Sequence, residues 1–407
     1  MHFLLAANTH FPCAFPCIPN VYPMSIQSQE RSLLPFVTLQ GAVGSLFAFI
    51  GFFLMRNRGH QAMFEFTAIM LTVAMVAAVL AYGFGARLGL GGKTLMKLGF
   101  FLPGIVLLSG NQSVWAMSFA YGSFLGLSWS ARHWLEMQLL SDGQRDAYAS
   151  HAGALAVGGS IVATLAATVL LTRSANSARL LYALYGAACI LAAWRLGRGM
   201  ADAPLQPLKA PLALARRPEF LACLPLFFLE SGLFGLGQAV TSIGASRAMG
   251  SAAALGTAAT VAGLAGGVGL YLSARRRDVD NRASWLGGSC LAMAIAFLFL
   301  AGSAWIPGLF VVHLIVKAVA HPFLGASEHV LNQRALDIAG DLGDRIVVRE
   351  VTLWIMRMLS LLGFWALSTA LPPTLMLAAG AVLMAAAVAL EYLVAHAWFG
   401  EPERQAA

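Results

Sequence analysis

The chain has 407 residues, of which 59% are hydrophobic and only 11% are charged. Water-soluble proteins carry roughly 25% charged residues, so this composition excludes an ordinary soluble domain. A membrane-spanning helix needs about 20 apolar residues, and the length leaves room for about a dozen of them. The formal net charge of +8 indicates membrane topology rather than binding to nucleic acid.

The N-terminal residues differ in character from the rest of the chain. Residues 1–23 contain four prolines and only a short apolar run, without a basic segment before it. This pattern fits neither a signal peptide nor a membrane span. Met24 then opens the polar stretch SIQSQER. We expect residues 1–32 to form a cytoplasmic tail, in which either Met24 is the natural start or the first 23 residues are disordered.

Apolar runs separated by polar residues, glycine or proline predict twelve helices. They cover residues 33–54, 64–84, 95–109, 112–140, 149–172, 176–195, 220–243, 251–273, 285–304, 308–331, 350–371 and 373–397.

One long polar connection divides these helices into two sets of six. It covers residues 196–219 and is rich in proline and arginine. The expected fold is therefore an all-α membrane protein with an N-terminal bundle over 33–195 and a C-terminal bundle over 220–397. A cytoplasmic tail, 398–407, follows the second bundle.

The positions of the basic residues predict the orientation in the membrane. With a cytoplasmic N-terminus, most of the 26 lysines and arginines lie in segments on the inside, and only Arg132, Lys317 and Arg357 fall within spans. Cytoplasmic loops carry the excess of basic residues in membrane proteins. We therefore expect a multi-pass protein of the inner (cytoplasmic) membrane with both termini on the cytoplasmic side.

The two halves echo one another in sequence. Arg132 and His133 close the fourth predicted helix, and Arg145 follows at the start of the fifth. Glu328 closes the tenth predicted helix in the same way, and Arg345 precedes the eleventh. Charged pairs at equivalent positions are typical of parallel repeats of two six-helix halves.

Over residues 33–397 the chain resembles the major facilitator superfamily of secondary transporters. The signature loop of that family reads G-x-x-x-D-R-x-G-R-R, and the stretch from Tyr82 to Gly91 keeps only Arg87 and Gly89 of it. The glycine–proline pattern of many proton-driven drug exporters is absent from the fifth predicted helix. The resemblance implies alternating access between two halves, with helices one, four, seven and ten lining a central cavity.

Each of these four helices carries a polar face. The fourth carries Tyr121, Ser128, Arg132 and Glu136 within roughly 80° of one another, and the last two are spaced as an i,i+4 ion pair. The first helix offers Gln40, whereas the seventh carries Glu230 near its middle and Gln238 further along. Arg132 either contacts a solute or only pairs with Glu136.

The tenth predicted helix is the most unusual. His313, Lys317, His321 and Glu328 fall within roughly 80° of one another on one face. A charged side chain at bilayer depth costs at least a few kcal/mol, so such residues usually line a polar path or pocket. Lys317 either contacts an anionic solute or neutralises Glu230.

The other charged residues favour gate or ion-pair roles. Glu350 and Arg357 lie seven residues apart on one face of the eleventh predicted helix. The gate and ion-pair candidates are Glu136, Glu328, Arg345, Glu350, Arg357 and Arg87.

Several other activities find no support in the sequence. Gly92-Lys93-Thr94 lacks the glycine that a phosphate-binding loop needs at position 87. The five cysteines show no zinc-ligand spacing, and methionines at helical spacing are typical of packing. We therefore expect no cofactor, no metal site and no enzymatic activity.

The sequence predicts a monomeric secondary active transporter, coupled to protons, for a small anionic or zwitterionic organic solute. The candidate protonation sites are Glu230, His313 and His321. The candidate solute contacts are Lys317, His313, His321, Arg132, Gln40, Tyr121 and Gln238. Two alternatives remain open: an exporter of a metabolite or drug with the same fold, and a transporter-like assembly factor for a membrane complex.

Overall fold

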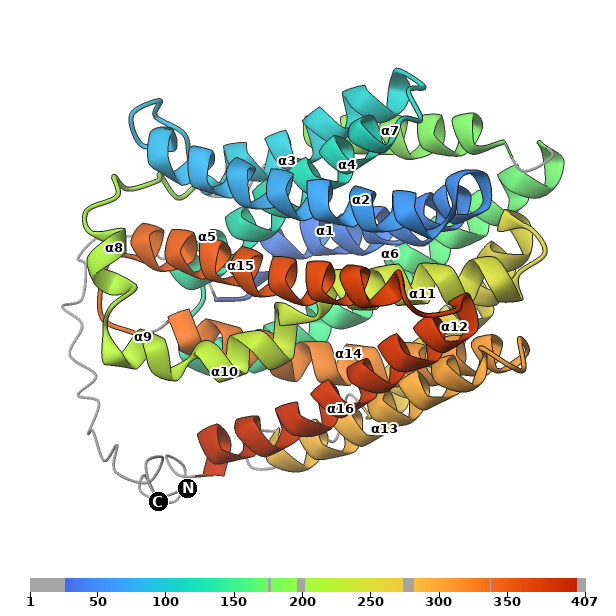
Figure 1. Ribbon diagram of the computed structural model, residues 1–407. Helices are drawn as coiled ribbons and strands as arrows, with labels where there is room; N and C mark the ends of the chain where they lie inside the picture. The colour runs from blue at the N-terminus through green and yellow to red at the C-terminus, as the bar shows by residue number, and fades with distance from the viewer. Residues whose placement is uncertain (1–25, 175–176, 196–201, 274–281, 337, 401–407) are drawn as a thin grey trace.

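The computed structural model describes residues 26–174, 177–195, 202–273, 282–336 and 338–400. Nearly all of these residues are helical, and within them the only pairing of extended backbone is an isolated bridge between Gly91 and Pro204. Figure 1 shows the helices lying side by side along one common direction. Met24 and the end of the predicted C-terminal tail lie outside the described residues.

The N-terminal half consists of eight helical elements. In chain order they are α1 (Ile26–Gly44), α2 (Leu46–Gly85), α3 (Gly92–Leu108), α4 (Val114–Ser123), the π-helical η1 (Phe124–Trp129), α5 (Ser130–Leu139), α6 (Asp142–Arg173) and α7 (Ala178–Arg195).

A single residue divides α2 into two helical segments. Gly59 has φ 79° and ψ −175°, a conformation that side-chain-bearing residues rarely adopt. The first and second predicted helices are therefore joined at a kink at this glycine, without a longer loop between them.

The C-terminal half contains ten helical elements, beginning with four short ones. They are α8 (Pro211–Leu214), α9 (Pro218–Ala222), α10 (Leu224–Phe227), the π-helical η2 (Phe228–Gly232), α11 (Phe234–Ala248), α12 (Ala252–Ser273), α13 (Arg282–Gly302), α14 (Leu309–Leu336), α15 (Leu342–Ser368) and α16 (Pro373–Gly400).

The predicted all-α membrane fold is confirmed, and within the described residues most of each predicted apolar run lies on helical backbone. Five helices in the described residues are long and apolar enough to cross a membrane, or six if α11 and α12, bent by 116°, count as one broken span. The number of twelve spans therefore stays a prediction.

Helix pairing repeats between the two halves. In the first half α2 packs on α4, α3 on α7 and α1 on α6, and in the second half α12 packs on α14, α13 on α16 and α11 on α15. The same relative pairs recur, which is what a parallel repeat requires. Between the halves, α6 lies against α12 and α14, and α2 lies against α11 and α15.

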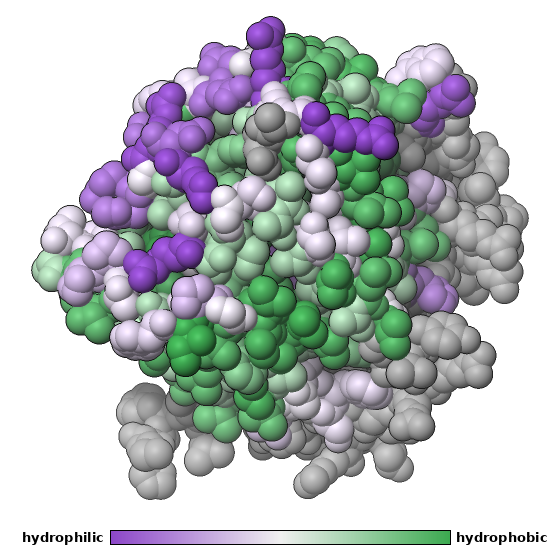
Figure 2. Space-filling view, turned by 90° about the vertical axis from the view of Figure 1, so that its right-hand side faces the viewer, coloured by the Kyte–Doolittle hydropathy of each residue, from purple (hydrophilic) through white to green (hydrophobic). Residues whose placement is uncertain are grey.

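The outer surface of the bundle is strongly apolar. Large hydrophobic side chains such as Val162, Leu359 and Trp115 are more than two-thirds exposed, at 69%, 69% and 67%. Figure 2 shows hydrophobic residues over much of one face, with the most hydrophilic residues gathered toward one edge. Apolar surface on this scale is typical of a protein that contacts lipid.

Candidate functional site

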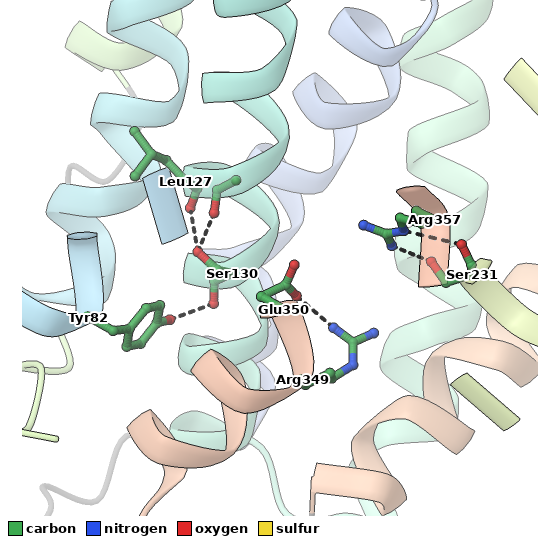
Figure 3. A network of polar contacts seen from close by, with 8 residues as sticks. Tyr82, Leu127, Ser130, Ser231, Arg349, Glu350 and Arg357 are labelled. Atoms are coloured by element: carbon green, nitrogen blue, oxygen red, sulfur yellow. Dashed lines mark hydrogen bonds and ion pairs between the residues drawn. The ribbon is translucent and has the colours of Figure 1, made fainter. Parts of the chain in front are cut away.

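A π-helical segment precedes Arg132 in the helix formed by α4, η1 and α5. Such a segment interrupts the regular backbone ladder and leaves carbonyl groups to be satisfied by other donors. The Ser130 hydroxyl lies 2.5 Å from the carbonyl oxygen of Gly126 and 3.4 Å from that of Leu127. The Tyr82 hydroxyl donates to the Ser130 carbonyl at 2.8 Å (Figure 3). These bonds fix the backbone immediately before Arg132.

Arg132 is buried, and its positive charge is balanced by other residues of the protein. Its Nε donates to Glu136 Oε1 at 2.6 Å, and the Glu136 side chain is fully buried. Its guanidinium also lies over the Trp129 ring, 5.2 Å from the ring centre. The buried hydroxyl of Tyr148, on α6, lies beside this pair. The predicted i,i+4 contact between Arg132 and Glu136 is present.

Gln40 connects this ion pair to α1. Its Oε1 accepts from Arg132 at 3.4 Å, and its Nε2 donates to Ser128 Oγ at 3.2 Å. Tyr121, in contrast, donates to the Gly44 carbonyl at 3.2 Å and packs against Phe47. Tyr121 therefore lies in a packing contact between α4 and the junction of α1 and α2.

Lys317, in α14, has a different environment. Its side chain is half-buried, and its ammonium makes no hydrogen bond or ion pair to any side chain that the structure describes. His321, one helical turn further on, is exposed. A cation in an apolar helix without a protein partner is costly, so its environment must supply polar groups or an anion.

His313, unlike Lys317 and His321, is not accessible from outside the protein. It is fully buried, and its Nδ1 lies 2.7 Å from the carbonyl oxygen of Ala296 in α13. Its ring packs between Phe297 and Phe310 at 5.8 Å from each. The four residues predicted on one face are therefore divided, because His313 points into the packing of the C-terminal half.

A second π-helical segment, η2, receives side chains from α15. Arg357 donates to the carbonyl oxygen of Ser231 at 3.2 Å and to its hydroxyl (Figure 3). Ser360 donates to the Gly232 carbonyl at 2.5 Å. The backbone of Glu230 belongs to η2, but its side chain lies outside the described part of the structure.

Glu350 and Arg357, predicted on one face, have different partners. Glu350 accepts from its neighbour Arg349 at 2.9 Å, close to Tyr82 of the N-terminal half. Arg345 donates to the Ile338 carbonyl at 2.9 Å.

The remaining predicted residues lie on three other parts of the chain. Gln238 is half-buried on α11, and Glu328 is half-buried on α14. Arg87 is exposed in the turn after α2 and has no hydrogen bond to the described residues.

Sequence reasoning missed three polar residues that the structure makes prominent. Ser231 binds Arg357, Tyr148 adjoins the Arg132 pair, and Glu391 is 1% exposed within α16. Glu391 alone had a usable signal, because it is the one acid within the apolar run 373–397.

No protein-family model matches the chain, and no curated protein sequence matches it either. Solved structures do match. The human organic anion transporter MFSD10 is 14% identical, with a TM-score of 0.58 over 91% of this chain and 99% of that one. The fucose:proton symporter FucP of E. coli is 16% identical, with a TM-score of 0.58 over 92% of this chain and 99% of that one.

The proton:xylose symporter XylE is 12% identical, with a TM-score of 0.62 over 92% of this chain and 95% of that one. Each of these proteins is described as a transporter or symporter, and XylE is described as a member of the major facilitator superfamily. At these identities the similarity establishes the fold. The chain has the fold of the major facilitator superfamily over nearly its whole length.

Proposed function

We propose that this protein is a secondary active transporter that moves a small anionic or zwitterionic organic solute by alternating access. The observation that carries the proposal is the half-buried Lys317 ammonium, which has no counter-charge among the described side chains. A solute anion is attracted to such a group more strongly than in water, because the surrounding dielectric constant is low. The exposed His321 beside it offers a further hydrogen-bonding contact.

The other buried cation is less suited to this role. A solute anion that approaches Arg132 has to compete with Glu136, which is already bonded at 2.6 Å. Breaking a buried ion pair is costly. We therefore assign the main charge contact to Lys317 and a positioning role to the Arg132–Glu136–Gln40 network.

The fold supports the remaining parts of the proposal. Proteins with this fold bind their solute between two halves that rock about a central site. FucP and XylE are described as proton symporters and MFSD10 as an organic anion transporter. We propose proton coupling through Glu230 or His321, a monomer in the inner membrane, and both termini in the cytoplasm. Measurement with right-side-out and inside-out vesicles will distinguish uptake from export.

A thermal-stability screen of the purified protein tests the solute class. A ligand that binds only the folded state raises the apparent Tm. The probes are small carboxylates, amino acids and neutral sugars, each at several concentrations. We expect stabilisation by at least one carboxylate or amino acid, and loss of that effect in Lys317→Met.

Lys97→Met is the matched control, because Lys97 is also a half-buried lysine, on α3, with no predicted role. It should keep the response of the wild type. Stabilisation by neutral sugars alone, or an unchanged response in Lys317→Met, contradicts the anion site. Stoichiometric co-purification of another protein, without a response to any solute, supports the assembly-factor alternative.

A further inference from the structure

A short part of the predicted linker, residues 202–210, contacts both halves of the protein. We call these residues the strap. In Figure 1 the strap runs along the left edge of the molecule and leads into α8. One end of the strap is bound beside the start of α3, and the other end is bound at the start of α15.

The first end is held by the N-terminal half through several contacts. The Asp202 carboxylate accepts from the backbone N–H of Lys93 at 2.9 Å and so caps the start of α3. The Ala203 carbonyl accepts from Gly92 N at 2.9 Å and from the Trp134 indole at 3.0 Å. The Leu205 N–H donates to the Leu90 carbonyl at 3.0 Å.

The second end is held by one carboxylate of the C-terminal half. The two oxygens of Asp344 accept from the backbone N–H groups of Lys209 and Ala210, at 3.0 and 2.8 Å. Asp344 is 4% exposed, so these bonds are shielded from water. The ion pair between Lys209 and Asp341 is exposed, and such pairs contribute little.

The two halves are in contact where the strap crosses between them. A Cβ placed on Gly343, at the start of α15, lies 3.3 Å from Leu208 of the strap and 3.9 Å from Trp134 of α5. The two halves therefore touch at this end of the bundle in the structure.

The length of the strap limits how far this end can open. Lys209, the first hydrogen bond to Asp344, lies four residues after Leu205, the last hydrogen bond to the N-terminal half. Fully extended, four residues span at most about 14 Å. While both ends of the strap stay bound, the extended length of this segment limits the distance between the start of α3 and the start of α15.

We propose that the strap is a latch that holds the two halves closed at the linker end, and that the Asp344 contact releases when this end opens. Asp344 is the releasing contact because it is a single side chain, whereas the other end is held by two backbone hydrogen bonds, the Asp202 cap and the Trp134 indole. This inference rests on the proposed alternating-access cycle.

Spin labels at Leu88→Cys and Ala339→Cys test the latch by double electron–electron resonance. Leu88 is 70% exposed, next to α3, and Ala339 is exposed, next to α15. We expect one short distance in the otherwise unchanged protein and an added population at longer distance in Asp344→Ala. Asp341→Ala is the matched control, because it removes an acid nearby but only an exposed contact, and it should keep the short distance.

An unchanged distance distribution in Asp344→Ala overturns the proposal. If that variant does not fold, insertion of four glycine and serine residues between Gln206 and Pro207 replaces it. The longer strap should also add a population at longer distance, and an unchanged distribution in the insertion variant overturns the latch. Because the measurement uses no solute, a failed solute screen leaves this result standing, and a failed latch leaves the anion site standing.

Discussion

Arg132 and Lys317 are both basic side chains inside predicted membrane spans, one in each half, and their surroundings differ. Arg132 is 7% exposed and bonded to Glu136 and Gln40, whereas Lys317 is half-buried with no bonded partner among the described side chains. A buried cation is stabilised either by its own counter-charge or by polar groups that reach it from outside the protein. The first arrangement builds the bundle, and the second leaves a charge available for a solute.

The comparison also predicts opposite costs of mutation. Removing one member of a buried ion pair leaves the other charge buried without compensation. Removing a cation that has no partner in the protein leaves no uncompensated charge, and it replaces a desolvated charge with apolar surface. Variants of the first kind should lose stability, and variants of the second kind should lose affinity.

The largest loss of stability is expected for Glu136→Gln. This change leaves the Arg132 charge buried, so the free energy of unfolding should fall by about 3–5 kcal/mol. Thermal unfolding in detergent measures the change. Glu65→Gln, an exposed glutamate on α2, is the control and should melt as the wild type does. Equal melting of the two variants contradicts a structural role for the Arg132–Glu136 pair.

An intermediate loss is expected for Arg357→Met. Arg357 binds the carbonyl and hydroxyl oxygens of Ser231 and no acid is needed for these bonds. Losing hydrogen bonds from a charged group costs about 1.5–3 kcal/mol. The same unfolding assay should show a smaller decrease than Glu136→Gln, and Arg87→Met, at an exposed site, should show none. A decrease as large as that of Glu136→Gln means that Arg357 neutralises a buried acid.

The smallest loss is expected for Gln40→Leu. The amide is 3.4 Å from Arg132 and 3.2 Å from Ser128, and both distances are long for hydrogen bonds. The free energy of unfolding should therefore fall by only about 1 kcal/mol. Gln238→Leu, on the equivalent helix of the other half, has no described hydrogen bond to lose and serves as control. If Gln40→Leu also abolishes the response to solute, Gln40 belongs to the solute site.

Local spacing predicted the features that depend on one helix alone. The i,i+4 spacing of Arg132 and Glu136 brings them together in any α-helix, and the apolar runs predicted the long helical regions but not α8, which lies in the predicted linker. His313 shows the limit of such reasoning. Helical spacing places His313 near Lys317, but the neighbouring α13 covers that side of α14. The spacing of residues within one helix does not predict which other helix packs against it.

Contacts between distant segments could not be predicted from the sequence. Glu350 and Arg357 share a face of α15, but they have different partners. Ser231, in the π-helical segment η2, accepts from Arg357, and Glu350 pairs with Arg349. The sequence contains no signal for where a helix changes to π geometry. The strap contacts of Asp202 and Asp344 likewise depend on how the linker folds back over both halves.

The most direct test of the account compares Lys317→Met alone with the double variant Lys317→Met/Glu230→Gln. Binding of the stabilising anion is measured by isothermal titration, and stability by thermal unfolding. Loss of a desolvated charge contact costs about 2–5 kcal/mol, which is more than a tenfold loss of affinity. The account predicts that loss in the single variant, with an apparent Tm equal to or above that of the wild type. A lowered Tm in the single variant, with stability and binding both restored in the double variant, contradicts it and assigns Lys317 to neutralising Glu230.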